Sequence, residues 1–395
     1  MDYKETLLMP NTEFQMKGNL PENEGIQREK WEKENLYQKI REKNKGKELF
    51  VLHDGPPYAN ANIHLGHALN KVLKDFVNRY AYMSGRDMVY IPGWDCHGLP
   101  VEQAVTNQGV DRKTLSKAEF RTICEEYAKE QIDLQMIGFK KLNVIGDWDN
   151  YYATLHKNQV AKQIEVFATM TKKGLIYKGM KPVYWSPSSE SALAEAEIEY
   201  HDRKDPSIYV AFPVVEGNKV VNKDDNLVIW TTTPWTLPGN TAIAVGEDFE
   251  YTKVAVNNQH YILATELLES LKEVFEWQDV KVISNFKGKD LAGIKYQHVF
   301  MDKVYPVVIG EEVTLEAGTG LVHTAPSYGE ADFNLGKKYD LEMVFGIDDQ
   351  GVLTKESGQF KGLFFEDANK EITKHLDEIG ALLKLNFITH SYPHD

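Results

Sequence analysis

The first half of the chain shows the hydrophobic spacing of helices that alternate with short strands. Residues 25–45 are densely charged with apolar positions at roughly helical intervals, which predicts a solvated helix with a narrow apolar stripe. The apolar run 49–53 predicts a buried strand that enters a loop, because an Asp-Gly-Pro-Pro turn follows it. A helix is expected at about residues 66–82, and its apolar face would comprise Ala68, Val72, Leu73, Phe76 and Val77. Strand, loop and helix in this order form the opening unit of a parallel α/β sheet.

Helices continue to about residue 173, and strands dominate after residue 181. Ser116 and Glu119 form a capping box, which predicts a helix start, and apolar spacing continues this helix to at least residue 132. A further helix is predicted at about residues 158–173. Later, short alternating runs predict strands at 208–212, 227–230, 304–308 and 320–323, interrupted by one helix at about 265–275. A β-rich domain is therefore expected to follow the α/β part.

The composition indicates a globular protein with more than one core. The chain has 395 residues, of which 42% are apolar, so we expect two domains. Its formal net charge of -14 disfavours non-specific attraction to polyanions, so a nucleic acid would need a local basic face. Cys96 and Cys124 form neither a disulfide framework nor a zinc-knuckle spacing. Without a leader-like start or an apolar run of roughly 20 residues, we expect a cytoplasmic protein with no membrane association.

The first candidate site lies at the predicted strand-to-helix turn, where residues 53–60 lead into His64-Leu65-Gly66-His67. A helix N-terminus presents free N–H groups and a partial positive charge, which suits a triphosphate, and two imidazoles could donate further hydrogen bonds. Taken alone, a His-x-Gly-His sequence is more often a surface loop. The chain contains neither a P-loop nor a Gly-x-Gly-x-x-Gly after a strand, which argues against the usual kinase, GTPase and dehydrogenase sites.

A second candidate segment, residues 90–102, places Asp95 after Trp94. A carboxylate suits a cationic amine in a partly closed site. The alternative is that Asp95 caps a turn while Trp94 packs in the core, and for Trp94 this is the favoured interpretation. Cys96 and His97 do not indicate a metal site, because adjacent residues rarely converge on one ion and no further ligands stand nearby.

The third candidate site combines two distant segments of the β-rich part. Thr231, Thr232 and Thr233 follow a β-run, and His323 and Asp332 lie about 90 residues further on. The threonines could simply belong to a strand, since threonine favours strands. A lone histidine such as His323 is more often a satisfied buried residue than a catalyst.

Taken together, these motifs resemble those of the class I aminoacyl-tRNA synthetases, in family order and over essentially the whole chain. His64 and His67 stand where the family has its HIGH signature, and the flanking Gly-Pro-Pro-Tyr-Ala-Asn resembles the isoleucine, valine and leucine branch, although Ala61 replaces the usual glycine. The resemblance implies that both histidines stabilise the ATP phosphates during adenylate formation. It also implies that Asp95 binds the amino acid's ammonium group and that Pro56 lines the side-chain pocket.

The threonine and histidine segments resemble the family's connective editing domain. The resemblance implies that Asp332 binds the ammonium group of a misattached amino acid, while Thr231, Thr232, Thr233 and His323 position the terminal adenosine of tRNA and a water. We expect direct attack of water on the ester, because the sequence shows no set of nucleophile, base and orienting residue that would indicate a covalent route. The loss of one methylene group changes binding to an apolar pocket by only about 1–3 kcal/mol, and isoleucine enzymes are themselves a standard example. A second site that selects amino acids by size therefore has a reason to exist.

Residues 181–200 resemble bacterial isoleucine enzymes more than valine or leucine ones. The expected fold is therefore α/β: the first half of a Rossmann-like catalytic domain at 1–184, an inserted β-rich editing domain at 185–389, and a return strand at 390–395. The expected partners are isoleucine, ATP with Mg²⁺, and isoleucine tRNA, bound by a monomer. Serines occupy positions 186, 188 and 189, where some relatives have cysteines, so no zinc is expected here.

The resemblance implies an isoleucine–tRNA ligase that forms the adenylate, charges tRNA and hydrolyses mischarged valyl-tRNA. The family's second catalytic signature is expected after residue 395, so editing is the activity that this chain is expected to retain. Three alternatives remain open: a stand-alone aminoacyl-tRNA deacylase, a non-catalytic tRNA-binding module, and a valine-specific enzyme.

Overall fold

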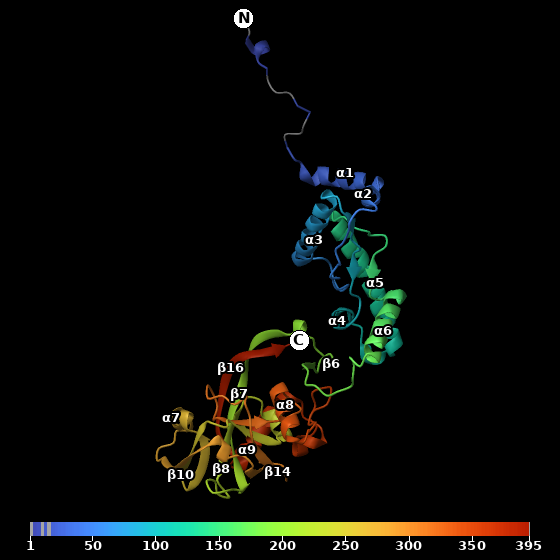
Figure 1. The fold of residues 1–395 in the computed structure, drawn as a ribbon. Coiled ribbons are helices and arrows are strands. Elements are labelled where there is room, and N and C mark those ends of the chain that lie inside the picture. The colour runs from blue at the N-terminus through green and yellow to red at the C-terminus, as the bar shows by residue number, and fades with distance from the viewer. Residues whose placement is uncertain (1–2, 9–11, 14–16, 395) are drawn as a thin grey trace. The chain divides into compact units, whose positions relative to one another are not determined.

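The computed structural model describes residues 3–8, 12–13 and 17–394, and the chain divides into two compact units between Lys178 and Gly179. Figure 1 shows a first unit made mainly of helices and a second made mainly of strands. An α/β protein with a β-rich second part is confirmed. No helix among these residues is long and apolar enough to cross a membrane.

The first unit combines helices with two small parallel sheets of two strands each. After the short turn η1 (Tyr3–Thr6), its elements in chain order are α1 (Leu20–Lys33), α2 (Leu36–Asn44), β1 (Leu49–Val51), α3 (Leu65–Met83), β2 (Asp87–Val89), β3 (Gly93–Trp94), α4 (Leu99–Asn107), η2 (Arg112–Thr114), α5 (Lys117–Lys141), β4 (Tyr152–Ala153) and α6 (Lys157–Lys172). β1 pairs with β2 in parallel, and β3 pairs with β4 in parallel. The predicted strand, loop and helix are confirmed, and so are the helix at about 158–173 and the capping box of α5, where Ser116 and Glu119 bond reciprocally. The single helix expected at 25–45 is wrong, because the chain breaks into α1 and α2 at Asn35, which has a left-handed φ of 49°.

Two burial predictions are wrong for this unit. β1 is not buried, since Leu49 is 61% exposed and Val51 is 59% exposed. The predicted apolar face of α3 is likewise largely exposed, with Phe76 at 62%. The helix instead buries a mostly polar face, comprising Lys71, Asp75 and Asn78 together with Ala81. The reason is that charged groups on this face have partners inside the unit.

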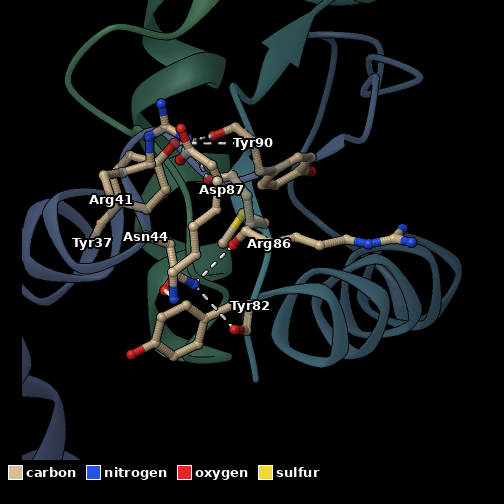
Figure 2. A network of polar contacts seen from close by, with 9 residues as sticks. Tyr37, Arg41, Asn44, Tyr82, Arg86, Asp87 and Tyr90 are labelled. Carbon is tan, nitrogen blue, oxygen red and sulfur yellow. Dashed lines mark hydrogen bonds and ion pairs between the residues drawn. The ribbon is translucent and has the colours of Figure 1, made fainter. Parts of the chain in front are cut away.

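The position of α2 against β2 is fixed by polar side chains (Figure 2). Arg41 forms an ion pair with Asp87 and donates to the Met88 carbonyl at 2.9 Å. The Asn44 amide donates to the carbonyl oxygens of Tyr82 and Arg86, at 3.1 and 2.8 Å. The chain between α3 and β2 is therefore held by side chains as well as by the sheet.

Asp54 joins α3 to the segment that follows β2. Its fully buried carboxylate forms ion pairs with Lys71 and, at 2.7 Å, with Lys74, and it accepts the Gly93 N–H at 3.0 Å. Burial would raise the pKa of Asp54, but the two lysines outweigh it and hold the pKa below its ordinary value. This cluster fixes the turn before α3.

The second unit contains most of the strands. Its elements are β5 (Trp185–Ser186), β6 (Ser191–Ala192), η3 (Glu195–Glu197), β7 (Glu199–Glu216), β8 (Asn226–Thr231), η4 (Pro234–Gly239), β9 (Ala242–Val245), β10 (Glu250–Val256), β11 (Gln259–Ala264), η5 (Thr265–Leu267), α7 (Leu268–Phe275), β12 (Lys281–Lys287), η6 (Gly288–Asp290), β13 (Lys295–Gln297), β14 (Val304–Ile309), β15 (Leu321–Thr324), α8 (Glu330–Tyr339), η7 (Lys355–Phe360), α9 (Phe365–Glu378) and β16 (Leu382–His394). The four predicted strand runs are confirmed, as is the helix near 265–275. The expectation of one helix is wrong, because α8 and α9 follow.

Six of these strands close into a ring. The pairings run β7–β8–β15–β9–β14–β13 and return from β13 to β7. The large hydrophobic core fills the unit, because inward-facing residues alternate along each strand of a closed sheet. β10, β11 and β12 extend the sheet beyond β8, and β16 runs antiparallel along β7 from Leu382 to His394.

We predict that Asp54→Ala destabilises the first unit by about 3–5 kcal/mol, because it leaves a buried ammonium without its counter-charge. Denaturant unfolding followed by far-UV circular dichroism measures the change. Glu125→Ala is the matched control. It breaks an exposed pair with Lys129 on α5, so it should change the free energy of unfolding by about 0.5 kcal/mol or less. Equal effects from the two substitutions would contradict this account of Asp54.

Candidate functional sites

The first site is the N-terminus of α3, where two histidines cap the helix. The His64 ring accepts the Gly66 N–H on Nδ1 at 3.0 Å, and the His67 ring accepts the His64 N–H on Nδ1 at 3.3 Å. The two rings stack with centroids 3.9 Å apart. A Cβ at Gly66 would lie 2.9 Å from the His64 ring, so the glycine makes room for this cap.

These bonds determine which ring nitrogens remain available. A neutral imidazole that accepts on Nδ1 carries its proton on Nε2, so both rings keep an Nε2–H that can donate. Burial, followed by the neighbouring His64, lowers the pKa of His67. The helix start therefore presents imidazole donors, while the two rings themselves cap the backbone N–H groups of His64 and Gly66.

Asp95 lies directly beside the segment that carries Pro56. The Asp95 N–H donates to the Pro57 carbonyl at 2.9 Å, and the Asp95 carbonyl accepts the Ala59 N–H at 2.8 Å. Both Pro56 and Asp95 are half-buried. From the residues that the structure describes, the Asp95 carboxylate accepts one long hydrogen bond, 3.5 Å from Thr154, so it remains able to take a strong donor.

Trp94 is a core residue, as the favoured interpretation held. Its ring is fully buried and its Nε1–H donates to Gln135 at 3.1 Å. Gln135 also donates to the Ala61 carbonyl, so α5 holds the loop that leads to His64. Across the described residues, no three histidine, cysteine, aspartate or glutamate side chains gather as a metal site would require.

The second site is a cavity of about 330 Å³ in the second unit. It forms because β15 pairs with β8, with Val322 opposite Trp230, which brings the threonine and histidine segments together. All five predicted residues of the third candidate site line it: Thr231, Thr232, Thr233, His323 and Asp332. Thr236, Glu312, Thr319 and Tyr328 are further lining residues.

The threonines form a bonded turn in which strand β8 ends, rather than an ordinary strand. Thr231 belongs to β8, and its hydroxyl accepts the Thr233 N–H at 3.1 Å. The Thr236 hydroxyl donates to the Thr233 carbonyl at 2.8 Å. The turn η4 follows directly and is almost entirely buried.

His323 is a satisfied buried histidine that also lines the cavity. Its Nε2 lies 3.0 Å from the Thr236 hydroxyl, and its Nδ1 lies 2.8 Å from the Asn240 amide nitrogen. Burial, with a smaller contribution from His298, lowers the pKa of His323 to about 3. The ring is therefore neutral near pH 7.

His298 supports the same turn from another side. Its Nε2–H donates to the Leu237 carbonyl of η4 at 2.9 Å, while Nδ1 accepts the backbone N–H groups of Phe300 and Met301. Burial lowers the pKa of His298 to about 4. Two neutral imidazoles thus hold η4 in place.

Asp332 supplies a carboxylate to the cavity from the first turn of α8. Its Oδ2 accepts the Ala325 N–H at 2.8 Å. Burial raises the pKa of Asp332, and the charge of Glu312 raises it further. The residues that line the cavity include these two carboxylates and no lysine or arginine, so it suits a cationic group.

Sequence reasoning missed several residues of this site. Thr236 and Asn240 lie within the Thr-Thr-Thr-Pro-Trp-Thr-Leu-Pro-Gly-Asn run and could have been found by reading that run to its end. Tyr296, His298 and Glu312 carry no local signal, because only the sheet brings them to η4 or the cavity. A separate cavity of about 380 Å³ lies between α1, α2 and the loop after α5, and no predicted site residue lines it.

Comparisons with known proteins show which family the chain belongs to. Residues 27–297 match the family model of class I tRNA synthetases (I, L, M and V). Isoleucine–tRNA ligases of Bacillus cereus strain B4264 and Geobacillus thermodenitrificans strain NG80-2 are each 58% identical over 100% of this chain and 43% of their own length. A crystal structure of LeuRS from Agrobacterium radiobacter K84 in a ternary complex with tRNA and LeuAMS is 17% identical, with a TM-score of 0.41, over 94% of this chain and 48% of that one. The chain spans less than half the length of the curated relatives it matches, and it belongs to the family of class I tRNA synthetases for isoleucine, leucine, methionine and valine.

Proposed function

We propose that this chain is part of an isoleucine–tRNA ligase and that its second-unit cavity hydrolyses tRNA mischarged with valine. The observation that carries the proposal is the gathering of Thr231, Thr232, Thr233, His323 and Asp332 around one cavity. The identity of 58% to isoleucine–tRNA ligases supports the choice of amino acid. The proposed partners are isoleucine, ATP and isoleucine tRNA.

In the first unit, the proposed reaction is formation of isoleucyl adenylate. The Nε2–H groups of His64 and His67 would donate to the ATP phosphates, where charge grows as the amino-acid carboxylate attacks the α-phosphate in line. Asp95 would hold the ammonium group, and Pro56 would contact the aliphatic side chain. Mg²⁺ would arrive with ATP as part of the substrate, and we assign it no protein ligand.

In the second unit, the proposed reaction is hydrolysis of the ester that joins valine to the terminal adenosine. The Asp332 carboxylate would bind the ammonium group of valine in a cavity without competing cationic side chains. The threonine hydroxyls would bind the adenosine and orient a water toward the carbonyl carbon. Because His323 is neutral and both its nitrogens are bonded, its part is to hold the turn rather than to take a proton.

Such a site answers a limit on discrimination. The loss of one methylene group weakens binding in an apolar pocket by only about 1–3 kcal/mol, and isoleucine enzymes are a standard example of this limit. A pocket built for isoleucine therefore admits valine too often. A second cavity that admits valine and excludes the larger side chain multiplies the two selectivities.

We further propose that residues 1–184 and 185–389 are the catalytic part and the inserted editing domain, and that 390–395 lead back toward catalytic elements. β16 supports this arrangement, because His390 to His394 pair with Arg203 to Glu199 of β7. The start of β7 and the end of β16 thus lie side by side in one two-stranded ribbon (Figure 1).

The editing proposal predicts selective release of valine. The chain should release valine from valyl-tRNA for isoleucine much faster than it releases isoleucine, measured as loss of the labelled amino acid from tRNA. Asp332→Ala should slow this release at least about 30-fold. The ammonium group of valine would lose its buried carboxylate partner, which costs about 2 kcal/mol or more of binding free energy.

Glu330→Ala is the matched control for this experiment. Glu330 lies in the same first turn of α8 but is exposed and does not line the cavity, so its substitution should leave the rate unchanged. Equal release of both amino acids would reject the second sieve. Binding of tRNA with no release of either would instead favour a binding module.

The buried Asp332 carboxylate should also lower the free energy of unfolding at neutral pH. Because its pKa is raised in the folded chain, the carboxyl group favours folding below its ordinary pKa, and this contribution is lost as pH rises through the raised value. Asp332→Asn should therefore increase the free energy of unfolding at pH 7.5, with a smaller gain at pH 4. Urea unfolding at both pH values measures this, and a loss of stability at pH 7.5 would contradict the account.

Residues 1–395 alone should not activate isoleucine. Large apolar side chains on β1 and on α3, the helix that His64 caps, stay exposed within the described part of the chain, including Val51 and Phe76. Isoleucine-dependent exchange of pyrophosphate into ATP should therefore stay at background in a preparation that still deacylates valyl-tRNA. Robust exchange would show that the first site is complete without further residues.

A further inference from the structure

Tyr296 lies behind the proposed editing site without lining its cavity. It belongs to β13, its ring is fully buried, and its centroid is 5.4 Å from that of Phe212 in an edge-to-face contact. Burial raises the pKa of Tyr296 well above its ordinary value, so the hydroxyl keeps its proton. That hydroxyl donates to Oδ1 of Asn240 at 2.5 Å.

The Asn240 amide can take only one orientation in these surroundings. Its nitrogen donates to the Ala242 carbonyl at 2.9 Å, and a carbonyl can only accept. With Oδ1 occupied by Tyr296, the remaining amide hydrogen points to Nδ1 of His323 at 2.8 Å. Asn240 is itself fully buried, so water does not offer its amide another partner.

The direction of the remaining hydrogen bonds follows from that orientation. Because Nδ1 of His323 must accept, the neutral ring carries its proton on Nε2 and donates to the Thr236 hydroxyl at 3.0 Å. Thr236 in turn donates to the Thr233 carbonyl at 2.8 Å. Each group in this series of hydrogen bonds therefore donates to the next, from the hydroxyl of Tyr296 to the threonine turn.

We propose that Tyr296 is a positioning residue for ester hydrolysis, which fixes His323 in its Nε2–H form through Asn240 and so orients the turn that carries Thr233. The inference rests on the proposed editing function, and it adds a residue that touches neither substrate nor cavity. His323 is thereby a donor whose task is to hold Thr236, and it does not accept the proton of the attacking water.

The Ala242 carbonyl sets which way the Asn240 amide faces, and the hydroxyl of Tyr296 holds the amide against His323. Without that hydroxyl, Oδ1 of Asn240 is buried without a donor, so the amide is free to shift away from Nδ1 of His323. Once Nδ1 loses the amide hydrogen, the ring can carry its proton on either nitrogen, because the Thr236 hydroxyl can accept from Nε2 or donate to it. Tyr296→Phe should therefore mix the two imidazole forms without changing the shape of the core.

The test is NMR of the chain with ¹⁵N-labelled histidine, combined with deacylation kinetics. In the unaltered chain, His323 should show the Nε2–H pattern unchanged from pH 8 to pH 5. Tyr296→Phe should mix the two patterns at His323 while leaving His298 as it was. In the same variant, kcat for release of valine should fall at least about tenfold with little change in KM, since Asp332 is untouched.

Tyr305→Phe is the matched control, because Tyr305 lies on the adjacent strand β14 and donates to Glu342 rather than to Asn240. It should leave the His323 spectrum and kcat unchanged. An Nδ1–H or charged His323 in the unaltered chain would overturn the proposal even if Tyr296→Phe failed to fold. A folded Tyr296→Phe with the original spectrum and kcat would overturn it as well. If the unaltered chain releases no valine, the editing proposal fails, and the spectra still decide the role of Tyr296.

Discussion

The pairing of β15 with β8 is the contact on which the rest of the second unit depends. Thr236 and His323 are 87 residues apart in sequence, and their hydrogen bond exists because this pairing sets Val322 opposite Trp230. Since β8 also pairs with β7, the same strand closes the six-stranded ring and ends in the threonine turn. The closed sheet therefore fixes the part of the cavity formed by β8 and β15, and the loop from Glu312 to Gly320 completes it.

Inside that frame, the cavity is built from polar groups that satisfy one another. The imidazoles of His298 and His323 are neutral and fully bonded, so they provide directed hydrogen bonds without adding positive charge. The charges of the lining side chains are those of Asp332 and Glu312. A cavity of this kind attracts an ammonium group. Its hydroxyls are already oriented before a substrate binds, and hydrolysis of an ester needs this electrostatic preorganisation.

Much of this arrangement could be predicted from the sequence, and the failures have a common cause. The helix start at His64, the capping box at Ser116 and the strand runs follow from local patterns that the structure confirms. The burial of α3 could not be predicted, because its buried face is chosen by the pairing of Lys71 with Asp54. Tyr296 and Glu312 were missed for the same reason, since their importance comes from distant partners. Periodicity reports which face is apolar, but only tertiary contacts decide which face is covered.

The central claim is that the second-unit cavity recognises a valyl adenosine by its ammonium group and by its size. Isothermal titration of the chain with valine joined to adenosine through a stable amide tests this most directly, beside the isoleucine compound and the valine compound without its amino group. The account predicts binding of the valine compound, binding weaker by at least about tenfold for the isoleucine compound, and a larger loss without the amine. Equal affinity for all three compounds would contradict it.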